Sequence, residues 1–364
     1  TTGMPKGVLW RQEDIFFAAL GGKPLGGMPA IGSVEELVER ARHGSLRALP
    51  APPFMHGAAH WVAFLTFHQG GTVVIQDHPE RLDAADVWAT VEREKVGFVA
   101  IVGDAFGRPL ADELARRRYD LTNLQVIGSG GAILTPSLKA ELLERIPHLM
   151  IFDGFGASET GGHGVHLSTA GGAVSTGRFT MSDTVILKDD LSGVLPRDSR
   201  ESGLLARFGR VPLGYYKDPE KSRRTFPTVD GTRYAAPGDH ACYGEDDSIA
   251  VLGRGSVCIN SGGEKIYPEE VEQALKHHPA VYDAVVVGTP SERWGQQVTA
   301  LVELREGASA SPDELTEFCT RRLSRYKLPK DILFVSRMVR SPSGKADYRW
   351  AKTEAEKRLR RTAP

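Results

Sequence analysis

The sequence predicts an α/β protein with a large layered α/β domain that includes a β-rich subdomain, followed by a small α+β domain. The length of 364 residues suits one large domain and one smaller domain. Up to about residue 152, short apolar runs alternate with amphipathic stretches, which is typical of strands connected by helices. From about residue 161, short apolar runs follow one another between turns, and a helical pattern returns at residue 268.

The first part of the chain is expected to contain a largely parallel sheet. Its expected strands are short apolar runs at 71–75, 97–102, 124–127 and 149–152. Its expected helices are amphipathic stretches at 84–95, 108–118 and 134–145. Pro136 is compatible with the last of these because it lies near the helix start.

The domain boundary is predicted between residues 253 and 254. The large domain would then cover 1–253, with a β-rich subdomain at about 165–252 whose strands are 183–188, 203–208 and 247–252. The small, mobile domain would cover 254–364. Its expected elements are helices at 268–277, from 312 and at 347–361, and strands at 284–288, 298–304 and 331–335. Ser311 and Pro312 are the predicted N-cap and first residue of the second helix.

Composition gives no reason to expect a nucleic acid or an anionic membrane as partner, because the formal net charge is −1. No run of eighteen apolar residues occurs, so no transmembrane helix is expected. Cys242, Cys258 and Cys319 form no Cys-x-x-Cys pair, so neither a disulfide framework nor a zinc site is expected. A reducing cytoplasm fits this cysteine usage.

The first eight residues, Thr-Thr-Gly-Met-Pro-Lys-Gly-Val, look like the second half of a phosphate-binding loop. Gly3 allows backbone conformations that are closed to other residues. The hydroxyls of Thr1 and Thr2 and the ammonium of Lys6 can surround a polyphosphate. The alternative is a flexible terminus.

The densest polar motif runs from Asp153 to Gly162, directly after the expected strand 149–152. Ligands of open α/β sheets bind at the carboxyl ends of the strands. Phe155 offers a flat face to a base, Ser158 a hydroxyl to a phosphate, and Glu159 a hard oxygen to Mg²⁺. Simple turns are the alternative explanation for its glycines.

Several shorter motifs carry the remaining candidates. Residues 129–132 (Ser-Gly-Gly-Ala) follow a strand and could pack bare backbone on a ligand ring. Asp239 and Arg254 suit ribose hydroxyls and phosphate. Lys345 follows a Ser-Pro-Ser-Gly turn, which alone is typical of a surface loop. Four histidines show no metal-binding spacing and are expected to be solvated or core residues: His56, His60, His163 and His166.

Taken in chain order, these motifs resemble the adenylate-forming superfamily, and within it the acyl-CoA synthetases. The resemblance extends from residue 1 to about residue 350. It also includes runs that begin at Pro53 (Pro-Phe-Met-His-Gly), Gly214 (Gly-Tyr-Tyr-Lys-Asp-Pro-Glu) and Gly263 (Gly-Glu-Lys-Ile-Tyr-Pro-Glu-Glu-Val-Glu). Residues 255–265 look most like ligases that act on fatty acids or steroid side-chain acids.

The resemblance implies two half-reactions. The carboxylate of a small-molecule acid attacks the α-phosphate of ATP to give an acyl-adenylate and pyrophosphate, and the thiol of coenzyme A then displaces AMP to give an acyl-CoA. ATP, Mg²⁺ and coenzyme A are therefore expected ligands, with a medium- or long-chain fatty acid or a steroid side-chain acid as substrate. A homodimer is left open.

The resemblance also implies roles for matching residues of the large domain. The β- and γ-phosphates would be held by Thr1, Thr2, Gly3 and Lys6. Adenine would be bound by Gly130, Gly131, Ala132, Asp153, Gly154 and Phe155. Ser158 would contact phosphate, Glu159 would carry Mg²⁺, and His56 would border the acyl pocket.

Other implied roles belong to residues from 239 onward. Asp239 would hold the ribose hydroxyls, aided by Arg254. Lys345 would lie over the α-phosphate and the attacking carboxylate during adenylation, where a cation offsets the repulsion between two anions. A cation on a mobile domain can be withdrawn once the adenylate forms. Gly262 and Gly263 would then flank the tunnel of the incoming thiol.

The sequence departs from the family pattern at several places. Pro237 stands where the family often has Thr, Phe155 where Tyr is usual, and Ser256 where the hinge often has Asp or Lys. The family's large domain has a substantial segment before the phosphate loop. We therefore expect the 364-residue chain to be part of a longer enzyme and to be inactive alone. Two alternatives stay open: an enzyme that loads a carrier protein, and a non-catalytic nucleotide-binding fragment.

Overall fold

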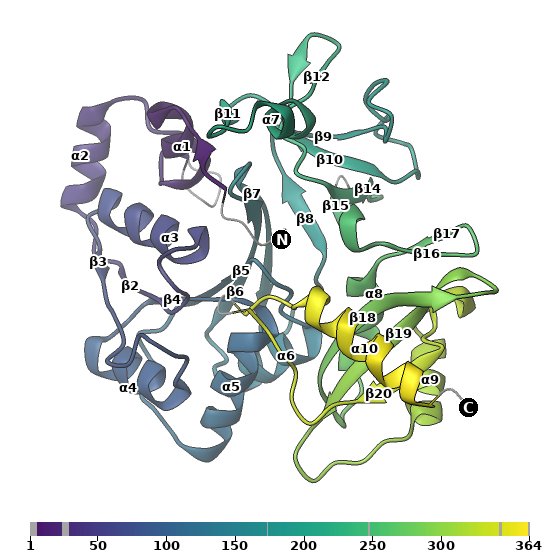
Figure 1. Cartoon of the computed structure of the whole chain (residues 1–364). Coiled ribbons are helices and arrows are strands. Elements are labelled where there is room, and N and C mark those ends of the chain that lie inside the picture. Colours follow the sequence, from purple (N-terminus) through teal and green to yellow (C-terminus); the bar gives the residue numbers. More distant parts are fainter. Residues whose placement is uncertain (1–5, 24–28, 173, 247, 342–343, 363–364) are drawn as a thin grey trace. The chain divides into compact units, whose positions relative to one another are not determined.

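A computed structural model describes residues 6–23, 29–172, 174–246, 248–341 and 344–362 (Figure 1). The chain forms two compact units. The first contains 1–237 and 242–250, and the second contains 238–241 and 251–364. Each unit has its own hydrophobic core. No helix within these described ranges is long and apolar enough to cross a membrane.

The first unit begins with the predicted parallel sheet. Its strands pair in parallel in the order β3 (Thr72–Val73), β2 (Arg47–Pro50), β4 (Phe98–Ile101), β5 (Val126–Gly130) and β6 (Met150–Ala157). The helices of this part are α3 (Gly57–His68), α4 (Ala84–Glu94), α5 (Gly103–Arg116) and α6 (Pro136–Arg145). The predicted helices 84–95 and 134–145 are confirmed, whereas α5 begins at Gly103 rather than at residue 108.

The start, the end and the buried face of helix α4 all follow from residues in its own sequence. The side chain of Asp83 caps its start by accepting hydrogen bonds from the backbone N–H groups of Ala85 and Asp86. Lys95 ends it in the left-handed conformation, with φ of 49°. Its apolar face buries Trp88 completely, and the Trp88 indole N–H donates to the Leu110 carbonyl at 2.9 Å. This face belongs to the core of the first unit.

Strand β6 differs from the sequence prediction. It continues to Ala157 instead of ending near Phe152, and it pairs antiparallel with β7 (Gly161–Thr169). The glycines of this motif lack side chains but keep their backbone groups, and β7 offers those groups hydrogen-bond partners. Most of the motif 153–162 therefore belongs to a β-hairpin, and the predicted end of the strand at residue 152 is wrong.

The β-rich region continues the same sheet. The order after β6 is β7, β8 (Arg178–Met181), β15 (Ile249–Arg254), β14 (Asp239–Tyr243), β10 (Gly203–Arg207) and β9 (Thr184–Leu187), which gives eleven strands in all. The pairs β7–β8, β8–β15 and β9–β10 are antiparallel. The largely parallel sheet expected in the first part of the chain is therefore confirmed for β2 to β6, and the β-rich region extends it with antiparallel pairs.

Smaller elements complete the first unit. Two-stranded sheets join β1 (Val8–Leu9) to β11 (Gly214–Tyr215) and β12 (Thr228–Val229) to β13 (Thr232–Arg233). Three further helices are α1 (Gln12–Ala19), α2 (Val34–Arg42) and α7 (Pro219–Thr225).

The second unit is a small α+β body. Its sheet contains β17 (Glu264–Ile266), β16 (Ile259–Ser261), β19 (Gly295–Leu304) and β18 (Val281–Ser291), and β20 (Asp331–Phe334) lies parallel to β19. Its helices are α8 (Pro268–Lys276), α9 (Pro312–Thr320) and α10 (Tyr348–Thr362), with short 3₁₀ turns at Gly255–Val257 and Arg325–Lys327. The capping prediction for α9 is confirmed, because Ser311 and Glu314 form a reciprocal capping box.

Candidate active site

Three segments far apart in the sequence meet around Tyr215. Strand β1 pairs with β11, with Val8 opposite Tyr215, and this brings the end of the N-terminal loop to the Tyr215 ring. The Lys6 ammonium lies 5.7 Å from the centroid of that ring. The Tyr215 hydroxyl donates a 2.6 Å hydrogen bond to Oε1 of Glu159. Lys6, a predicted phosphate ligand, and Glu159, a predicted magnesium ligand, therefore both contact the buried Tyr215.

Sequence reasoning missed Tyr215. It lies inside the Gly-Tyr-Tyr-Lys-Asp-Pro-Glu motif, which was recognised without a role for any of its residues. The pairing of β1 with β11 is what gives Tyr215 its place beside Glu159. Thr1, Thr2 and Gly3, the other predicted phosphate ligands, lie outside the described residues.

The turn that carries Ser158 and Glu159 is held by side chains from other elements. The Trp10 indole N–H donates to the Ser158 carbonyl at 3.0 Å. The buried Arg207 guanidinium donates to the carbonyls of Thr160 and of Gly162, the latter at 2.9 Å. These contacts fix the backbone of the β6–β7 turn, so the Glu159 carboxylate projects from a rigid base.

Glu159 is compatible with magnesium, although the described residues contain no group of three or more His, Cys, Asp or Glu side chains that could hold a metal ion. Mg²⁺ is usually bound by one or two carboxylates together with substrate phosphates, not by a protein cage. One carboxylate beside Lys6 and Tyr215 therefore fits an ion that arrives with a polyphosphate.

The Phe155 ring is part of an aromatic group on the β6–β7–β8 surface. Its centroid lies 5.4 Å from that of Phe179 and 5.9 Å from that of His163. Burial lowers the pKa of His163 to about 3, so the ring is neutral, and its Nε2 contacts the Thr184 hydroxyl at 2.9 Å. Within the pair β5–β6, Gly130 lies opposite Gly154, and Gly131 and Ala132 follow directly.

Asp153 lies in the interior. Its carboxylate forms an ion pair with Lys139 of α6, whose side chain is 0% exposed, and Lys139 also donates to the Ser175 carbonyl at 2.6 Å. Burial raises the pKa of Asp153 to about 6, although Lys139 opposes this shift. The predicted role of Asp153 in adenine binding stays a prediction. Lys139 was missed because nothing in an amphipathic helix pattern distinguishes a buried lysine from a solvated one.

His56 lies at the N-terminus of α3, where its backbone N–H donates to the Pro53 carbonyl at 3.0 Å. Phe54 and Met55 beside it are exposed. Its predicted place at the border of an acyl pocket remains a prediction.

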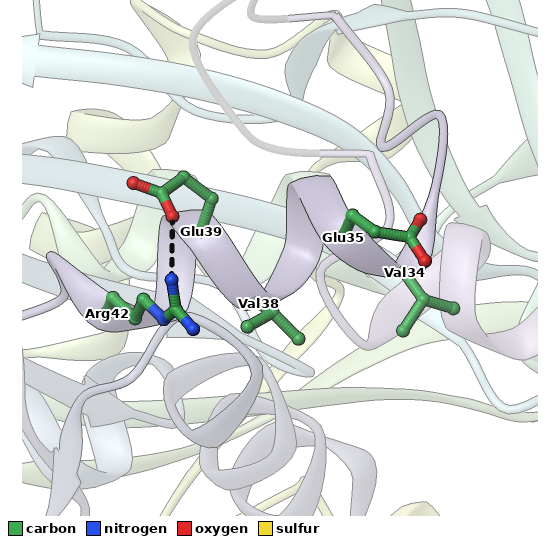
Figure 2. Close-up of a pocket in the computed structure, with 5 residues that line it drawn as sticks. All are labelled: Val34, Glu35, Val38, Glu39 and Arg42. Atoms are coloured by element: carbon green, nitrogen blue, oxygen red, sulfur yellow. Dashed lines mark hydrogen bonds and ion pairs between the residues drawn. The ribbon is translucent and has the colours of Figure 1, made fainter.

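A surface pocket beside α2 contains none of the candidate residues. Figure 2 shows its lining, which comes from α2 alone: Val34, Glu35, Val38, Glu39 and Arg42. Val34 is 71% exposed and Val38 is 45% exposed.

In the second unit, the structure brings together the two predicted ribose ligands. Nε of Arg254 donates to Oδ1 of Asp239 at 3.2 Å, and the Gly255 N–H donates to the Gly238 carbonyl at 3.1 Å. Gly262 and Gly263 form the turn between β16 and β17 with φ of 61° and 91°, values that favour glycine. Lys345 lies in the connection between β20 and α10.

Glu269 of α8 lies against the backbone of Gly253, where an added Cβ would approach its Oε2 within 2.3 Å. Burial raises the pKa of Glu269 to about 8, and the neighbouring Glu272 raises it further. Glutamate normally titrates near 4.5, so between about pH 4.5 and 8 the folded protein holds one more proton here than the unfolded protein.

This proton makes stability depend on pH. The contribution of Glu269 to the free energy of unfolding is fully present below about pH 4.5. It is lost as the pH rises to about 8, by at most about 1.4 kcal/mol per pH unit. Glu269→Gln removes this dependence. Urea unfolding of both proteins at pH 5 and pH 8 should show the variant gaining stability relative to the wild type at the higher pH. An equal pH dependence in both would contradict the assignment.

Comparisons with known proteins agree with this architecture. The AMP-binding enzyme family matches residues 1–216, and the AMP-binding enzyme C-terminal domain matches residues 270–345. The structure of the amide bond synthetase McbA from Marinactinospora thermotolerans superposes with a TM-score of 0.78 at 25% identity, over 97% of this chain and 67% of that chain. The predicted α/β large domain with a small C-terminal domain is therefore confirmed.

Two curated relatives match nearly the whole chain. The medium-chain acyl-CoA ligase Mig of Mycobacterium avium is 50% identical over 357 residues, which cover 98% of this chain and 65% of Mig. A medium/long-chain-fatty-acid–CoA/3-oxocholest-4-en-26-oate–CoA ligase of Mycobacterium tuberculosis is 44% identical over 362 residues, with the same two coverages. The chain thus spans about 65% of the length of these relatives. From the two family matches and these identities, we conclude that the chain belongs to the AMP-binding enzyme family.

Proposed function

We propose that the protein is an AMP-forming acyl-CoA ligase that acts on a medium- or long-chain fatty acid or a steroid side-chain acid. The observation that carries the proposal is the meeting of Lys6, Tyr215 and Glu159, which suits a magnesium-bound polyphosphate. The acyl class and the thiol acceptor are inferred from relatives at 50% and 44% identity. The three free cysteines fit a reducing cytoplasm as the site of this reaction.

In the first half-reaction, a carboxylate oxygen attacks the α-phosphorus of ATP. The new O–P bond forms as the bond to the β-phosphate oxygen breaks, and pyrophosphate leaves. Lys6 would bind the outer phosphates, Ser158 would donate to a phosphate oxygen, and Phe155 would stack on adenine. Lys345 would lie between the two anionic reactants and lower their repulsion. Mg²⁺ held by Glu159 would neutralise charge on the phosphates.

In the second half-reaction, the sulfur of coenzyme A attacks the acyl carbon of the adenylate. The C–S bond forms, the bond to the AMP oxygen breaks, and AMP leaves while the thiol proton passes to solvent. Lys345 has no role in this step, so its withdrawal would free space for the thiol. Gly262 and Gly263 would offer bare backbone to the coenzyme A arm. Asp239 and Arg254 would hold the ribose in both steps.

The test uses the protein at its natural length with ATP, Mg²⁺, coenzyme A and a panel of acetic, octanoic, palmitic and steroid side-chain acids. We expect thioester, AMP and pyrophosphate in equal amounts with octanoic acid, palmitic acid or the steroid acid, and little product with acetic acid. Formation of adenylate without any transfer to coenzyme A would favour carrier-protein loading. Absence of acid-dependent AMP release with every acid would contradict the proposal.

A further inference from the structure

We propose that Arg340 is a positioning residue for Lys345, acting through a clamp between Asp283 and the turn that carries the lysine. The inference rests on the proposed function, because it concerns the lysine assigned to adenylation. It adds a side chain that no motif of the sequence had indicated. All of the contacts that carry it lie within the second unit.

The clamp is a guanidinium with two different partners. Nε and Nη2 of Arg340 donate to the two carboxylate oxygens of Asp283 at 2.7 and 2.6 Å. Nη1 donates to the carbonyl of Gly344 at 3.0 Å. A guanidinium presents its donors in a fixed plane, so a bidentate pair with Asp283 also fixes the direction of the third donor. That donor holds the residue directly before Lys345.

The turn around Lys345 is closed by its own hydrogen bonds. Ser341 N–H donates to the Lys345 carbonyl at 2.9 Å, and Lys345 N–H donates to the Ser341 hydroxyl at 3.2 Å. Gly344 N–H donates to the Ser341 carbonyl at 2.8 Å, and Gly344 has φ of 76°, which favours glycine. A β-bridge joins Arg340 to Ala346. The described residues Ser341, Gly344 and Lys345 are therefore linked to one another, and a contact that holds Gly344 also restrains the backbone of Lys345.

The other end of the clamp is a rigid, charged anchor. Asp283 lies at the start of β18 with its side chain 10% exposed, and Nζ of Lys276 lies 3.2 Å from its Oδ1. The two cations lower the pKa of Asp283 to about 2 despite its burial, so the carboxylate stays ionised. Lys276 would still partner Asp283 if Arg340 were replaced. Loss of the clamp therefore need not leave a buried carboxylate unpaired or unfold the unit.

The clamp matters because the lysine side chain is long and flexible. Fixing the backbone from which it projects reduces the volume that its ammonium samples, and misplacement by about 1 Å can cost on the order of a hundredfold in rate. Lys345 is assigned to adenylation alone. A positioning residue for Lys345 should therefore affect that half-reaction selectively, whereas a purely structural residue would affect both.

The test compares Arg340→Gln and Arg340→Lys with a matched control, Arg358→Gln. Arg358 belongs to the same unit and also joins a carboxylate to a backbone carbonyl, through Glu354 and Phe334, both at 2.6 Å. Two reactions are measured in the protein at its natural length. Acid-dependent ATP–pyrophosphate exchange reports adenylation, and transfer from synthetic acyl-adenylate to coenzyme A reports thioester formation.

We expect Arg340→Gln to lower the exchange rate by at least about tenfold and to leave the transfer rate nearly unchanged. The exchange rate of Arg340→Lys should lie between those of Arg340→Gln and the wild type, because lysine keeps the positive charge but lacks the planar set of guanidinium donors. Arg358→Gln should retain both rates. Equal loss of both rates, or unchanged exchange, would overturn the proposal. A wild type without acid-dependent exchange would instead contradict the proposed function.

A second readout needs no activity. Trypsin cleaves after lysine in mobile segments, so release of the turn should speed cleavage between Lys345 and Ala346. The folded protein is digested, and mass spectrometry measures the rate of this cleavage. Cleavage should be faster in Arg340→Gln than in the wild type and in Arg358→Gln. Equal cleavage rates in all three would show that Arg340 does not restrain the turn.

Discussion

Replacement of Lys345 by alanine is expected to abolish acid-dependent ATP–pyrophosphate exchange. In the proposed mechanism, the substrate carboxylate and the α-phosphate are both anions, and Lys345 supplies the cation between them. Loss of one such preorganised charge typically costs about 10²–10³-fold in rate. Lys345 belongs to a turn that Arg340 and Ser341 hold through backbone groups, so truncation of its side chain leaves those contacts in place. The fold should therefore be retained.

The control for this experiment is Lys352→Ala on α10, because Lys352 is an exposed lysine of the same unit. Its exchange rate should equal that of the wild type. Transfer from synthetic acyl-adenylate to coenzyme A should persist in Lys345→Ala. Wild-type exchange by Lys345→Ala would remove the lysine from the mechanism, whereas loss of transfer as well would show that its role is not confined to adenylation.

The second large effect concerns stability. Replacement of Lys139 by methionine is expected to destabilise the first unit by about 3–5 kcal/mol, the usual cost of breaking a buried ion pair from one side. The Lys139 side chain is 0% exposed and that of Asp153 is 7% exposed. Without the ammonium, Asp153 must either keep a buried charge or take up a proton. Burial already raises the pKa of Asp153, and loss of the cation would raise it further.

Urea unfolding measures this effect, with hydrogen exchange of the amides in β5 and β6 as the readout for the first unit. The double variant Lys139→Met/Asp153→Asn should recover much of the lost stability, because it removes the uncompensated carboxylate. The loss in Lys139→Met should also diminish at low pH, where Asp153 is protonated. If the double variant were as unstable as Lys139→Met, lost packing rather than unpaired charge would be the cause.

Local patterns predicted many elements because their determinants are close in sequence. The start of α9 follows from Ser311, Pro312 and Glu314, which form a capping box within one turn. The length of β6 did not follow, because strand pairing depends on a partner. Gly154 and Gly156 lie beyond the predicted end of the strand at residue 152, and pairing with β7 makes them strand residues.

The candidate site divides in the same way. Lys6, Phe155, Glu159, Asp239 and Lys345 are predicted site residues that short motifs indicate, because nucleotide binding would constrain residue types at short spacings. The residues that support them were not found. Arg207 donates to the carbonyls of Thr160 and Gly162 from a strand more than forty positions further along the chain. Tyr215 and Arg340 likewise have partners more than fifty positions away, and Lys139 pairs with a carboxylate on another element.

The sequence by itself determined the family and the α/β class, and it predicted which side chains are chemically reactive. These properties depend on residue type, local periodicity and order along the chain, all of which a single sequence contains. Only the tertiary structure decided that Tyr215 contacts Glu159, that Lys139 pairs with Asp153 and that Arg340 pairs with Asp283. The physical reason is that burial and hydrogen bonding depend on distances between segments. An arginine or tyrosine looks the same in a sequence whether it faces solvent or a buried partner.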